Sequence, residues 1–285
     1  MVIIKKNNNM KNLKDFGINT DNKTYIIAEI GINHGGDINL AKKLIDSVAR
    51  TGADAVKFQT YLTEKRVSKD SPIFDILKKC ELPFQAFKEL QIYANKLNLD
   101  FFSTPFDNES VKFLESINMN LYKIASFDIV NKELLKKVAS LKKPVIMSTG
   151  MSNLKEINTA YNILTQKTDK IVLLHCISSY PTEENDANLL AISHLKESFN
   201  CVIGQSDHTN DIKVPLLAVA AGAQVIEKHF KIDDNMDCVD APVSISESQL
   251  KELVSGIREV EKIFGDGFMG ITSAEKEIVP FRRFS

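Results

Sequence analysis

The segment GADAVKFQTY, residues 52–61, carries two polar side chains inside an apolar run that is typical of a β-strand. Lys57 and Gln59 are two residues apart, which is the repeat of a strand, so they point to the same side. Val56 and Phe58 point to the other side. A strand of a parallel sheet is normally apolar on both faces because helices cover both. The pattern therefore predicts that one face of this strand opens onto a polar site.

The same arrangement recurs along the chain. Each of the apolar runs ends in residues that can bind or react with a ligand. These residues are Glu29 and Asn33, Lys57 and Gln59, Thr104, Lys123 and Ser126, Ser148, His175 and Ser178, Ser206 and His208, and Glu227 and His229. A single lysine or histidine at a strand end is more often a paired structural residue than a catalyst. A repeat at every strand end favours a ligand, because burying several charged groups without partners is costly.

One subset of these residues suits a small anion. Lys57 and Lys123 are predicted to point inward as ammonium groups, which form charge-assisted hydrogen bonds with phosphate and carboxylate oxygens. The accompanying hydroxyl donors are Thr104, Ser126, Ser148, Ser178 and Ser206. Together they predict a site for a compound that carries both phosphate and carboxylate groups.

A second subset suits a divalent transition metal. His208 and His229 lie near the ends of neighbouring strands, and Glu227 or Asp240 supplies a carboxylate nearby. Two imidazoles with open positions fit such a metal, which could polarise a carbonyl group as a Lewis acid. Glu29 is placed to activate a water molecule or to move a proton.

The elements that must position these residues are strands alternating with helices. The expected strands are residues 25–33, 55–60, 100–106, 121–126, 144–149, 171–177, 201–208 and 225–230, with helical patterns at 38–52, 152–166 and 246–265. This alternation predicts a parallel sheet. Eight such units in 285 residues match a TIM (β/α)8 barrel, whose strand carboxyl ends form the active-site face. A doubly wound open sheet is the alternative, but GINHGGD is not the G-x-G-x-x-G fingerprint of that fold.

Composition and segment patterns predict a cytoplasmic protein with one main domain. The chain is 44% hydrophobic and 26% charged, as globular proteins are, and its net charge of -1 does not favour nucleic acid as a partner. Four scattered cysteines indicate a reducing compartment, and no apolar run predicts a signal peptide or membrane span. We expect a polar N-terminal extension at 1–24, the barrel at 25–265, with a long loop at 62–83, and a tail at 266–285.

Joined together, these motifs resemble the sialic acid synthase family, the phosphoenolpyruvate-dependent N-acetylneuraminate synthases and their relatives. The matching stretches are IIAEIGINHGGD, GADAVKFQTY, FFSTPFD, YKIAS, IMSTGM, LLHCISSYPT, IGQSDHT and IEKHF. They run in family order across nearly all of the expected barrel. The resemblance implies a TIM barrel that condenses phosphoenolpyruvate with an amino sugar in its open-chain aldehyde form, and releases phosphate.

Residue by residue, the resemblance implies three sets of roles. Phosphoenolpyruvate would be held by Lys57, Thr104, Lys123, Ser126, Ser148, Ser178 and Ser206, although position 178 is Asn in many relatives. His208 and His229 would ligate a divalent metal, with Mn²⁺ expected. The sugar, the metal-bound water or the metal's surroundings would be contacted by Glu29, Gln59, Tyr180, Glu227 and Asp240.

Two departures from the family pattern bear on the sugar. Many relatives have Gly-Pro-Asp-His before a Ser where this chain has CVDAPVS, residues 238–244. This difference leaves the sugar open. We expect N-acetylneuraminate as the first choice of product, with pseudaminate or legionaminate as the alternative. Many relatives also continue into a small antifreeze-like domain, which supplies an arginine to the partner's sugar site. We expect that domain to be absent here and the chain to form a homodimer.

The missing arginine and the chemistry of the site leave alternatives open. Arg282 or Arg283 could fold back over a barrel, or a separately encoded antifreeze-like polypeptide could bind as a partner. A different reaction class is a Schiff-base aldolase that uses Lys57 or Lys123 as its nucleophile. A further alternative is a non-catalytic subunit of a sugar pathway that keeps the pocket without turnover.

Overall fold

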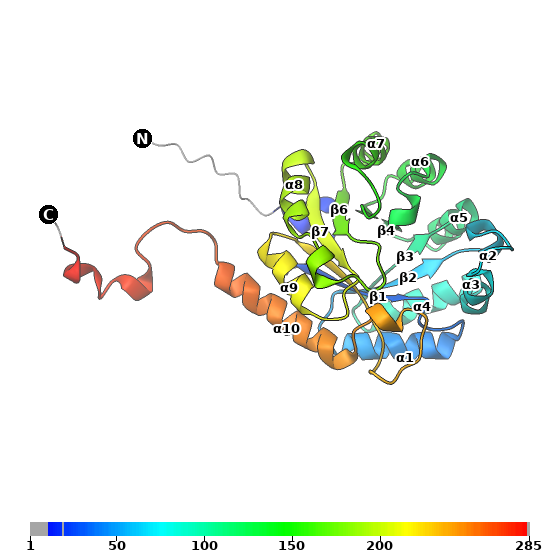
Figure 1. Cartoon of the computed structure of the whole chain (residues 1–285), viewed down its shortest axis with the longest axis horizontal. Coiled ribbons are helices and arrows are strands. Elements are labelled where there is room, and N and C mark those ends of the chain that lie inside the picture. Colours follow the sequence, from blue (N-terminus) through cyan, green and yellow to red (C-terminus); the bar gives the residue numbers. More distant parts are fainter. Residues whose placement is uncertain (1–10, 19, 284–285) are drawn as a thin grey trace.

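A closed barrel of eight parallel strands, β1 to β8 in sequence order, forms the centre of the molecule (Figure 1). The computed structural model describes residues 11–18 and 20–283. The strands are β1 Tyr25–Gly31, β2 Ala55–Thr60, β3 Asp100–Pro105, β4 Tyr122–Ile124, β5 Val145–Ser148, β6 Ile171–Cys176, β7 Val202–Asp207 and β8 Val225–His229. β1 pairs with β8, which closes the sheet. The predicted TIM barrel is confirmed, and the doubly wound alternative is wrong because an open sheet keeps two edges.

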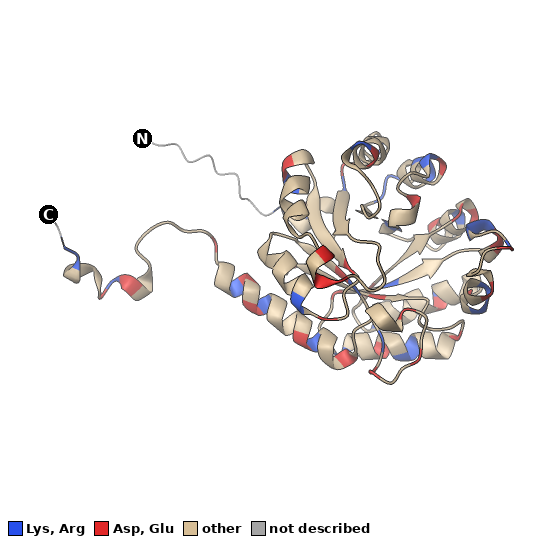
Figure 2. Ribbon diagram, in the orientation of Figure 1, with Lys and Arg blue, Asp and Glu red and all other residues tan. Residues whose placement is uncertain are grey.

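Helices connect the strands and cover the outside of the barrel (Figure 1). They are α1 Ile38–Ala49, α2 Thr63–Arg66, α3 Phe74–Cys80, α4 Phe84–Lys96, α5 Asn108–Ser116, α6 Lys132–Ser140, α7 Leu154–Thr165, α8 Leu190–Ser198, α9 Lys213–Ala220 and α10 Glu247–Phe264. α10 begins with a capping box, in which Gln249 Oε1 accepts from the Ser246 backbone N at 3.0 Å. Charges of both signs alternate along the outer helices, as α10 illustrates (Figure 2). Among the described helices, none has the length and apolar character needed to span a membrane.

The segment between β2 and α4 is not the loop predicted for residues 62–83, because it contains α2 and α3. These helices are too short to produce an apolar stripe that sequence periodicity could reveal. Glu81 holds α2 in place by accepting hydrogen bonds from the Thr63 backbone N at 2.8 Å and from its hydroxyl at 2.6 Å. Tyr61 donates to the Leu77 carbonyl at 2.9 Å, which ties the end of β2 to α3. The carboxyl end of β2 is thus enclosed by fixed structure.

The predicted N-terminal extension is partly built into the fold. Its residues 1–10 and 19 lie outside the described residues, but Leu13 and Ile18 are buried in the main core. Lys11 N donates to Gln224 Oε1 at 3.1 Å, and Gln224 Nε2 donates back to the Lys11 carbonyl at 2.6 Å. Gln224 directly precedes β8, so this segment covers the amino ends of the strands. The described part of the extension therefore belongs to the barrel domain.

The segment after α10 leads away from the barrel (Figure 1). It contains two short 3₁₀ turns, Ser273–Glu275 and Val279–Phe281, and its apolar side chains are exposed, with Met269 at 93%. Residues 284 and 285 lie outside the described residues. In this structure the segment that carries Arg282 and Arg283 does not lie over the chain's own barrel.

A buried ion pair on the outer face of the barrel joins the ends of β7 and β8. The register pairs Asp207 with Lys228, between the sheet and the helices. Lys228 is 0% exposed, donates to Asp207 Oδ2 at 2.6 Å, and also donates to the Thr209 carbonyl. Asp207 accepts a further bond from the Thr209 hydroxyl at 2.7 Å. Because His208 follows Asp207 and Glu227 and His229 flank Lys228, this pair fixes the strand ends that present those three side chains.

Asp207→Asn and Lys228→Met are each expected to destabilise the fold by about 3–5 kcal/mol, because either change leaves an uncompensated buried group. The double variant Asp207→Leu/Lys228→Met should recover most of that loss, since it removes both charges. Urea denaturation measures the change. Lys42→Met, which breaks the surface pair of Lys42 with Glu89, is the control and should lose less than about 1 kcal/mol. Single variants as stable as the control would contradict the assignment.

Candidate active site at the barrel mouth

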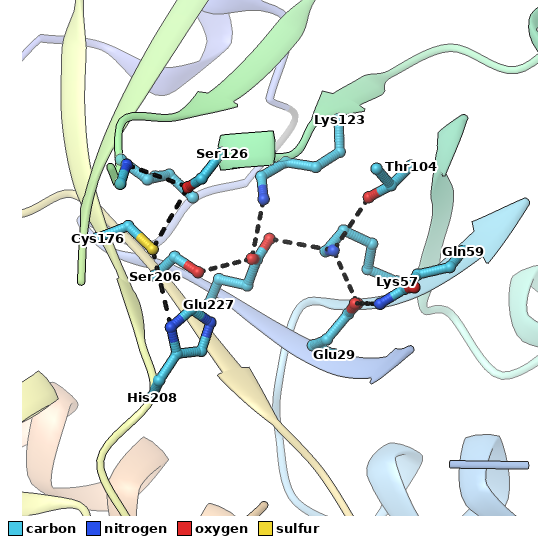
Figure 3. A network of polar contacts seen from close by, with 12 residues as sticks. Glu29, Lys57, Gln59, Thr104, Lys123, Ser126, Cys176, Ser206, His208 and Glu227 are labelled. Atoms are coloured by element: carbon cyan, nitrogen blue, oxygen red, sulfur yellow. Dashed lines mark hydrogen bonds and ion pairs between the residues drawn. The ribbon is translucent and has the colours of Figure 1, made fainter. Parts of the chain in front are cut away.

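Two lysines and two glutamates form a buried ion network at the carboxyl ends of the strands (Figure 3). Lys57 Nζ lies 2.9 Å from Glu29 Oε2 and 3.6 Å from Glu227 Oε2. Lys123 Nζ lies 3.0 Å from Glu227 Oε1. All four residues are buried, so their two positive and two negative charges compensate one another inside the barrel.

The network separates the pKa values of its members. Burial opposes the charge of Glu227, but Lys123 and Lys57 outweigh it and hold the pKa of Glu227 well below its usual range. Burial likewise lowers the pKa of Lys57, but Glu227 and Glu29 raise it above its ordinary value. For Lys123, burial and the positive charge of Lys57 together outweigh the effect of Glu227, so the pKa of Lys123 is lowered. Glu227 is therefore held ionised and Lys57 protonated, while Lys123 is the more weakly held cation.

The predicted hydroxyl donors surround this network. Lys57 Nζ donates to Thr104 Oγ1 at 3.2 Å, and Ser206 Oγ donates to Glu227 Oε1 at 2.8 Å. Both hydroxyls thus help to orient the charged groups.

Three further serines gather around Gly150, beyond Lys123. Gly150 N donates to Ser126 Oγ at 3.0 Å. A Cβ at position 150 would lie 2.4 Å from Ser178 Oγ, so the close approach of these groups requires glycine. Ser148 Oγ is buried and has no hydrogen-bond partner among the described residues. The serines therefore form a cradle with an unused hydroxyl, as a bound anion requires.

His208 and His229 meet beside the network, with ring centroids 5.4 Å apart. His208 Nδ1 donates to the Ile177 carbonyl at 2.7 Å, because a carbonyl only accepts, and this leaves the lone pair on Nε2. His229 Nδ1 is buried without a hydrogen-bond partner among the described residues, 3.4 Å from Asp240 Oδ2. The Tyr180 ring covers His208, at 4.2 Å between centroids.

These observations fit a divalent metal held by two imidazoles. A metal-binding histidine commonly donates its other N–H to a carbonyl, as His208 does here. Within residues 11–18 and 20–283, no group of three or more His, Cys, Asp or Glu side chains is arranged to hold a metal by itself. Any metal at His208 and His229 would thus keep positions for water or substrate, which suits Lewis-acid chemistry.

Asp240, Glu29 and Gln59 converge over Gly31, where β1 has an irregular register and a φ of 56°. A Cβ at Gly31 would lie 3.2 Å from Asp240 Oδ2 and Glu29 Oε1, and 3.3 Å from Gln59 Nε2. Gln59 Nε2 donates to Glu29 Oε1 at 3.2 Å. Burial raises the pKa of Asp240, but the nearby His229, His208 and Arg66 keep it below its ordinary value. This corner is therefore a second polar area, separated from the serines by the ion network.

The loop after β1 holds this corner in place. Asn33 Oδ1 accepts from the Asp240 backbone N at 2.9 Å, and Asn33 Nδ2 donates to the Phe230 carbonyl at 2.9 Å. The next residue, His34, accepts from Gly36 N at 3.1 Å through Nδ1 and stacks on Phe58. Burial lowers the pKa of His34 to about 4. This loop is thus built around a neutral histidine.

The structure corrects one strand-end prediction. The β6 register pairs His175 with Gln205 and Cys176 with Ser206, so Cys176 faces the site and His175 faces outward. His175 Nε2 lies 2.7 Å from the Ala187 carbonyl. The spacing in the sequence did not reveal this, because Ser178 lies beyond the end of β6 and does not follow the repeat of the strand.

Two residues near the site were missed. The Cys176 thiol lies 3.8 Å from His208 Nδ1 and 3.6 Å from Ser126 Oγ. Arg66 donates from Nη1 to Gln59 Oε1 at 3.0 Å. No sequence pattern marked Arg66, because it belongs to the segment that was predicted to be a loop.

Wild-type stability is expected to fall as pH drops from 6.5 towards 4, in part because the unfolded chain protonates His34 before the folded chain does. The His34 contribution is complete above the unfolded pKa and reaches a loss of about 2–3 kcal/mol near pH 4. His34→Asn keeps an acceptor for Gly36 N but removes the titration, so its stability should depend less on pH. Urea denaturation between pH 4 and 8 measures this. The control is His194→Asn on the exposed face of α8. Parallel pH profiles for wild type and His34→Asn would contradict the prediction.

The comparisons with known proteins all indicate the same family. The NeuB family profile matches residues 44–269. An N,N'-diacetyllegionaminic acid synthase of Campylobacter jejuni is 43% identical over 280 residues, which covers 92% of this chain and 84% of that protein. The N-acetylneuraminate-9-phosphate synthase of Mus musculus is 32% identical and covers 90% and 73% respectively.

A solved structure supports the same relationship. The crystal structure of an N-acetylneuraminic acid (sialic acid) synthetase from Leptospira borgpetersenii superposes with a TM-score of 0.89 at 41% identity, and covers 92% of each chain. Together with the profile match and the named relatives, this places the chain in the NeuB family of sugar-acid synthases.

Proposed function

We propose that this chain condenses phosphoenolpyruvate with an open-chain N-acylated amino sugar, and forms a nonulosonic acid and phosphate. The observation that carries the proposal is the buried network of Lys57, Glu29, Glu227 and Lys123. It lies between a serine cradle suited to an anion and a polar corner suited to a neutral sugar. Such an arrangement can hold two different substrates next to each other, which is the first requirement for joining them.

The anionic substrate is assigned to the lysine and serine side of the site. Each ammonium group has three N–H donors, and Lys123 uses one on Glu227. Its remaining donors, with the unpartnered Ser148 hydroxyl, are available to phosphate oxygens. Lys57 and Thr104 complete the set on the other side of Glu227.

The reaction forms a carbon–carbon bond and breaks a carbon–oxygen bond. Carbon 3 of phosphoenolpyruvate supplies the electron pair of its double bond to the aldehyde carbon, and the aldehyde oxygen takes up a proton. Water then adds at carbon 2, and phosphate leaves with the electrons of its C–O bond. Glu29 is assigned to orient that water and accept one of its protons, which balances the proton taken up by the aldehyde oxygen. The second proton leaves with phosphate as carbon 2 becomes a keto group. Glu227 pairs with both lysines. A divalent metal, proposed to be Mn²⁺ on His208 and His229, would supply Lewis-acid polarisation of the aldehyde oxygen.

The sugar is assigned to Gln59, Asp240 and Tyr180. We favour a diacetamido-trideoxyhexose, which would give a legionaminate- or pseudaminate-type product, because relatives named for those products include one that is 43% identical. N-acetylmannosamine, which would give N-acetylneuraminate, is the second candidate. It is favoured by the sialic acid synthetase structure at 41% identity. The homodimer, the cytoplasmic location and a separate antifreeze-like partner stay predictions of the sequence.

A Schiff-base mechanism is disfavoured for Lys57 by its electrostatics. A Schiff base needs a neutral amine, whereas Glu227 and Glu29 raise the pKa of Lys57. The pKa of Lys123 is lowered, so that residue is the stronger candidate for covalent chemistry. Borohydride treatment in the presence of substrate, followed by mass spectrometry, separates the two classes of reaction. We expect no reduced adduct on either lysine.

Purified protein supplied with Mn²⁺ and phosphoenolpyruvate is expected to release phosphate only when an N-acylated amino sugar is added. The screen compares the diacetamido sugar, N-acetylmannosamine and N-acetylglucosamine, and identifies the products by mass spectrometry. EDTA should abolish phosphate release, and added Mn²⁺ or Co²⁺ should restore it. A wild-type enzyme that binds phosphoenolpyruvate but turns over none of the sugars would overturn the condensation, and favour a non-catalytic role.

Lys57→Ala and Lys123→Ala are each expected to weaken phosphoenolpyruvate binding about ten- to a hundredfold, the effect of losing a charge-assisted hydrogen bond. Titration calorimetry measures the dissociation constant, and thermal melting checks that each variant is folded. Lys78→Ala removes a lysine from the surface helix α3 and should leave the affinity unchanged. If both folded variants bind with wild-type affinity, these lysines only stabilise the barrel.

A further inference from the structure

Arg66 reaches the polar corner of the site from the end of α2. Its Nη1 donates to Gln59 Oε1 at 3.0 Å, and Gln59 in turn donates to Glu29 Oε1 at 3.2 Å. Gln59 lies at the edge of the ion network in Figure 3. Arg66 is therefore connected to the reactive centre through one side chain.

Two aromatic rings hold the Arg66 guanidinium. Its Cζ lies 3.7 Å from the centroid of the Phe106 ring and 4.6 Å from that of the Tyr61 ring. Tyr61 is 2% exposed, and its hydroxyl is fixed on the Leu77 carbonyl. A guanidinium held against aromatic rings keeps its N–H donors pointing in set directions. The group is thus ordered before any ligand arrives.

The charge of Arg66 has no direct counter-ion in the described part of the chain. No described carboxylate oxygen lies within 4.0 Å of an Arg66 nitrogen, which is the limit for an ion pair. Burial lowers the pKa of Arg66, and Asp128, Asp240 and Glu29 act on it only from a distance. A guanidinium has five N–H donors, and Gln59 accepts from one nitrogen. The Arg66 side chain is only partly buried, so its remaining donors are accessible to an acceptor on a ligand.

We propose that Arg66 binds the acylamino carbonyl oxygen of the amino sugar and selects N-acylated sugars. This inference rests on the function proposed above. Arg66 lies on the side of Gln59, Glu29 and Asp240, whereas the serine cradle assigned to phosphoenolpyruvate lies beyond Lys123. An amide carbonyl is a strong neutral acceptor, and it suits a guanidinium whose charge three more distant carboxylates already offset in part. Arg66 is therefore a specificity-determining residue supplied by this chain itself.

The test compares wild type with Arg66→Met and Arg66→Lys. Met keeps an apolar chain against the two rings without donors, and Lys keeps the charge without the planar fork. Arg50→Met is the matched control, because Arg50 follows α1 at the opposite end of the barrel and pairs with Glu247. Calorimetry with Mn²⁺ present measures binding of phosphoenolpyruvate, N-acetylmannosamine, the diacetamido sugar and mannose, which has no acylamino group. Steady-state kinetics give kcat and KM for each sugar.

Arg66→Met is expected to raise the KM and dissociation constant of the acylated sugars about ten- to a hundredfold. Phosphoenolpyruvate affinity should stay within twofold, and kcat should change much less than KM. Arg66→Lys should recover part of the loss, and the response to mannose should be nearly the same in all variants.

Four results would overturn the assignment. Unchanged binding of acylated sugars by Arg66→Met would exclude the contact, and an equal loss for mannose would show that Arg66 binds a hydroxyl group. An equal loss for phosphoenolpyruvate, together with a lowered melting temperature, would show that Arg66 only supports α2. If wild type binds phosphoenolpyruvate but no sugar, the proposed function fails as well, which distinguishes that case from a failure of Arg66 alone.

Discussion

The charge compensation between Lys57, Glu29, Glu227 and Lys123 is the constraint on which the rest of the site depends. An isolated ammonium or carboxylate group would be costly inside a barrel. Here each charge has an opposite one within 3.6 Å, so the mouth can remain buried and still hold strong hydrogen-bond donors. The hydroxyls of Thr104 and Ser206 then join the same network rather than acting as separate ligands. The geometry of the anion site therefore follows from an internal balance of charge.

The barrel maintains this balance by fixing strand ends from both faces. On the inner face, the register brings Ser206 beside Glu227. On the outer face, the same register brings Asp207 beside Lys228, where the two form a fully buried pair. A one-residue shift in the pairing of β7 with β8 would turn the inward side chains of one strand outward. It would disrupt both contacts at once. The alternation of polar residues in QSDHT and EKHF thus encodes a hydrogen bond on the inner face and an ion pair on the outer face.

The sequence predicted the barrel and most of the residues that meet at its mouth, because both depend on strand periodicity. Lys57 and Gln59, Ser206 and His208, and Glu227 and His229 are each two residues apart, and the repeat placed them on one face. His175 was misplaced because its neighbours suggested a strand end, while the parity of β6 puts Cys176 inward. Arg66 was missed for a different reason. Its position depends on α2 and on packing against Phe106, and neither leaves a periodic signal in the sequence.

This difference between strand residues and residues of connecting segments explains why the choice of substrate is harder to predict from a sequence than the type of reaction. The strand ends supply the groups for the anion and for proton movement, and their positions are fixed by the barrel itself. The polar corner adds residues of connecting segments to the strand residues Glu29 and Gln59. The added residues are Asn33 in the first loop, Arg66 in α2 and Asp240 after β8. Connecting segments vary in sequence without disturbing the barrel, so they can change the sugar while the ion network stays the same. We therefore expect specificity among acylated sugars to depend on these connecting segments, through the contacts of Asn33, Arg66 and Asp240.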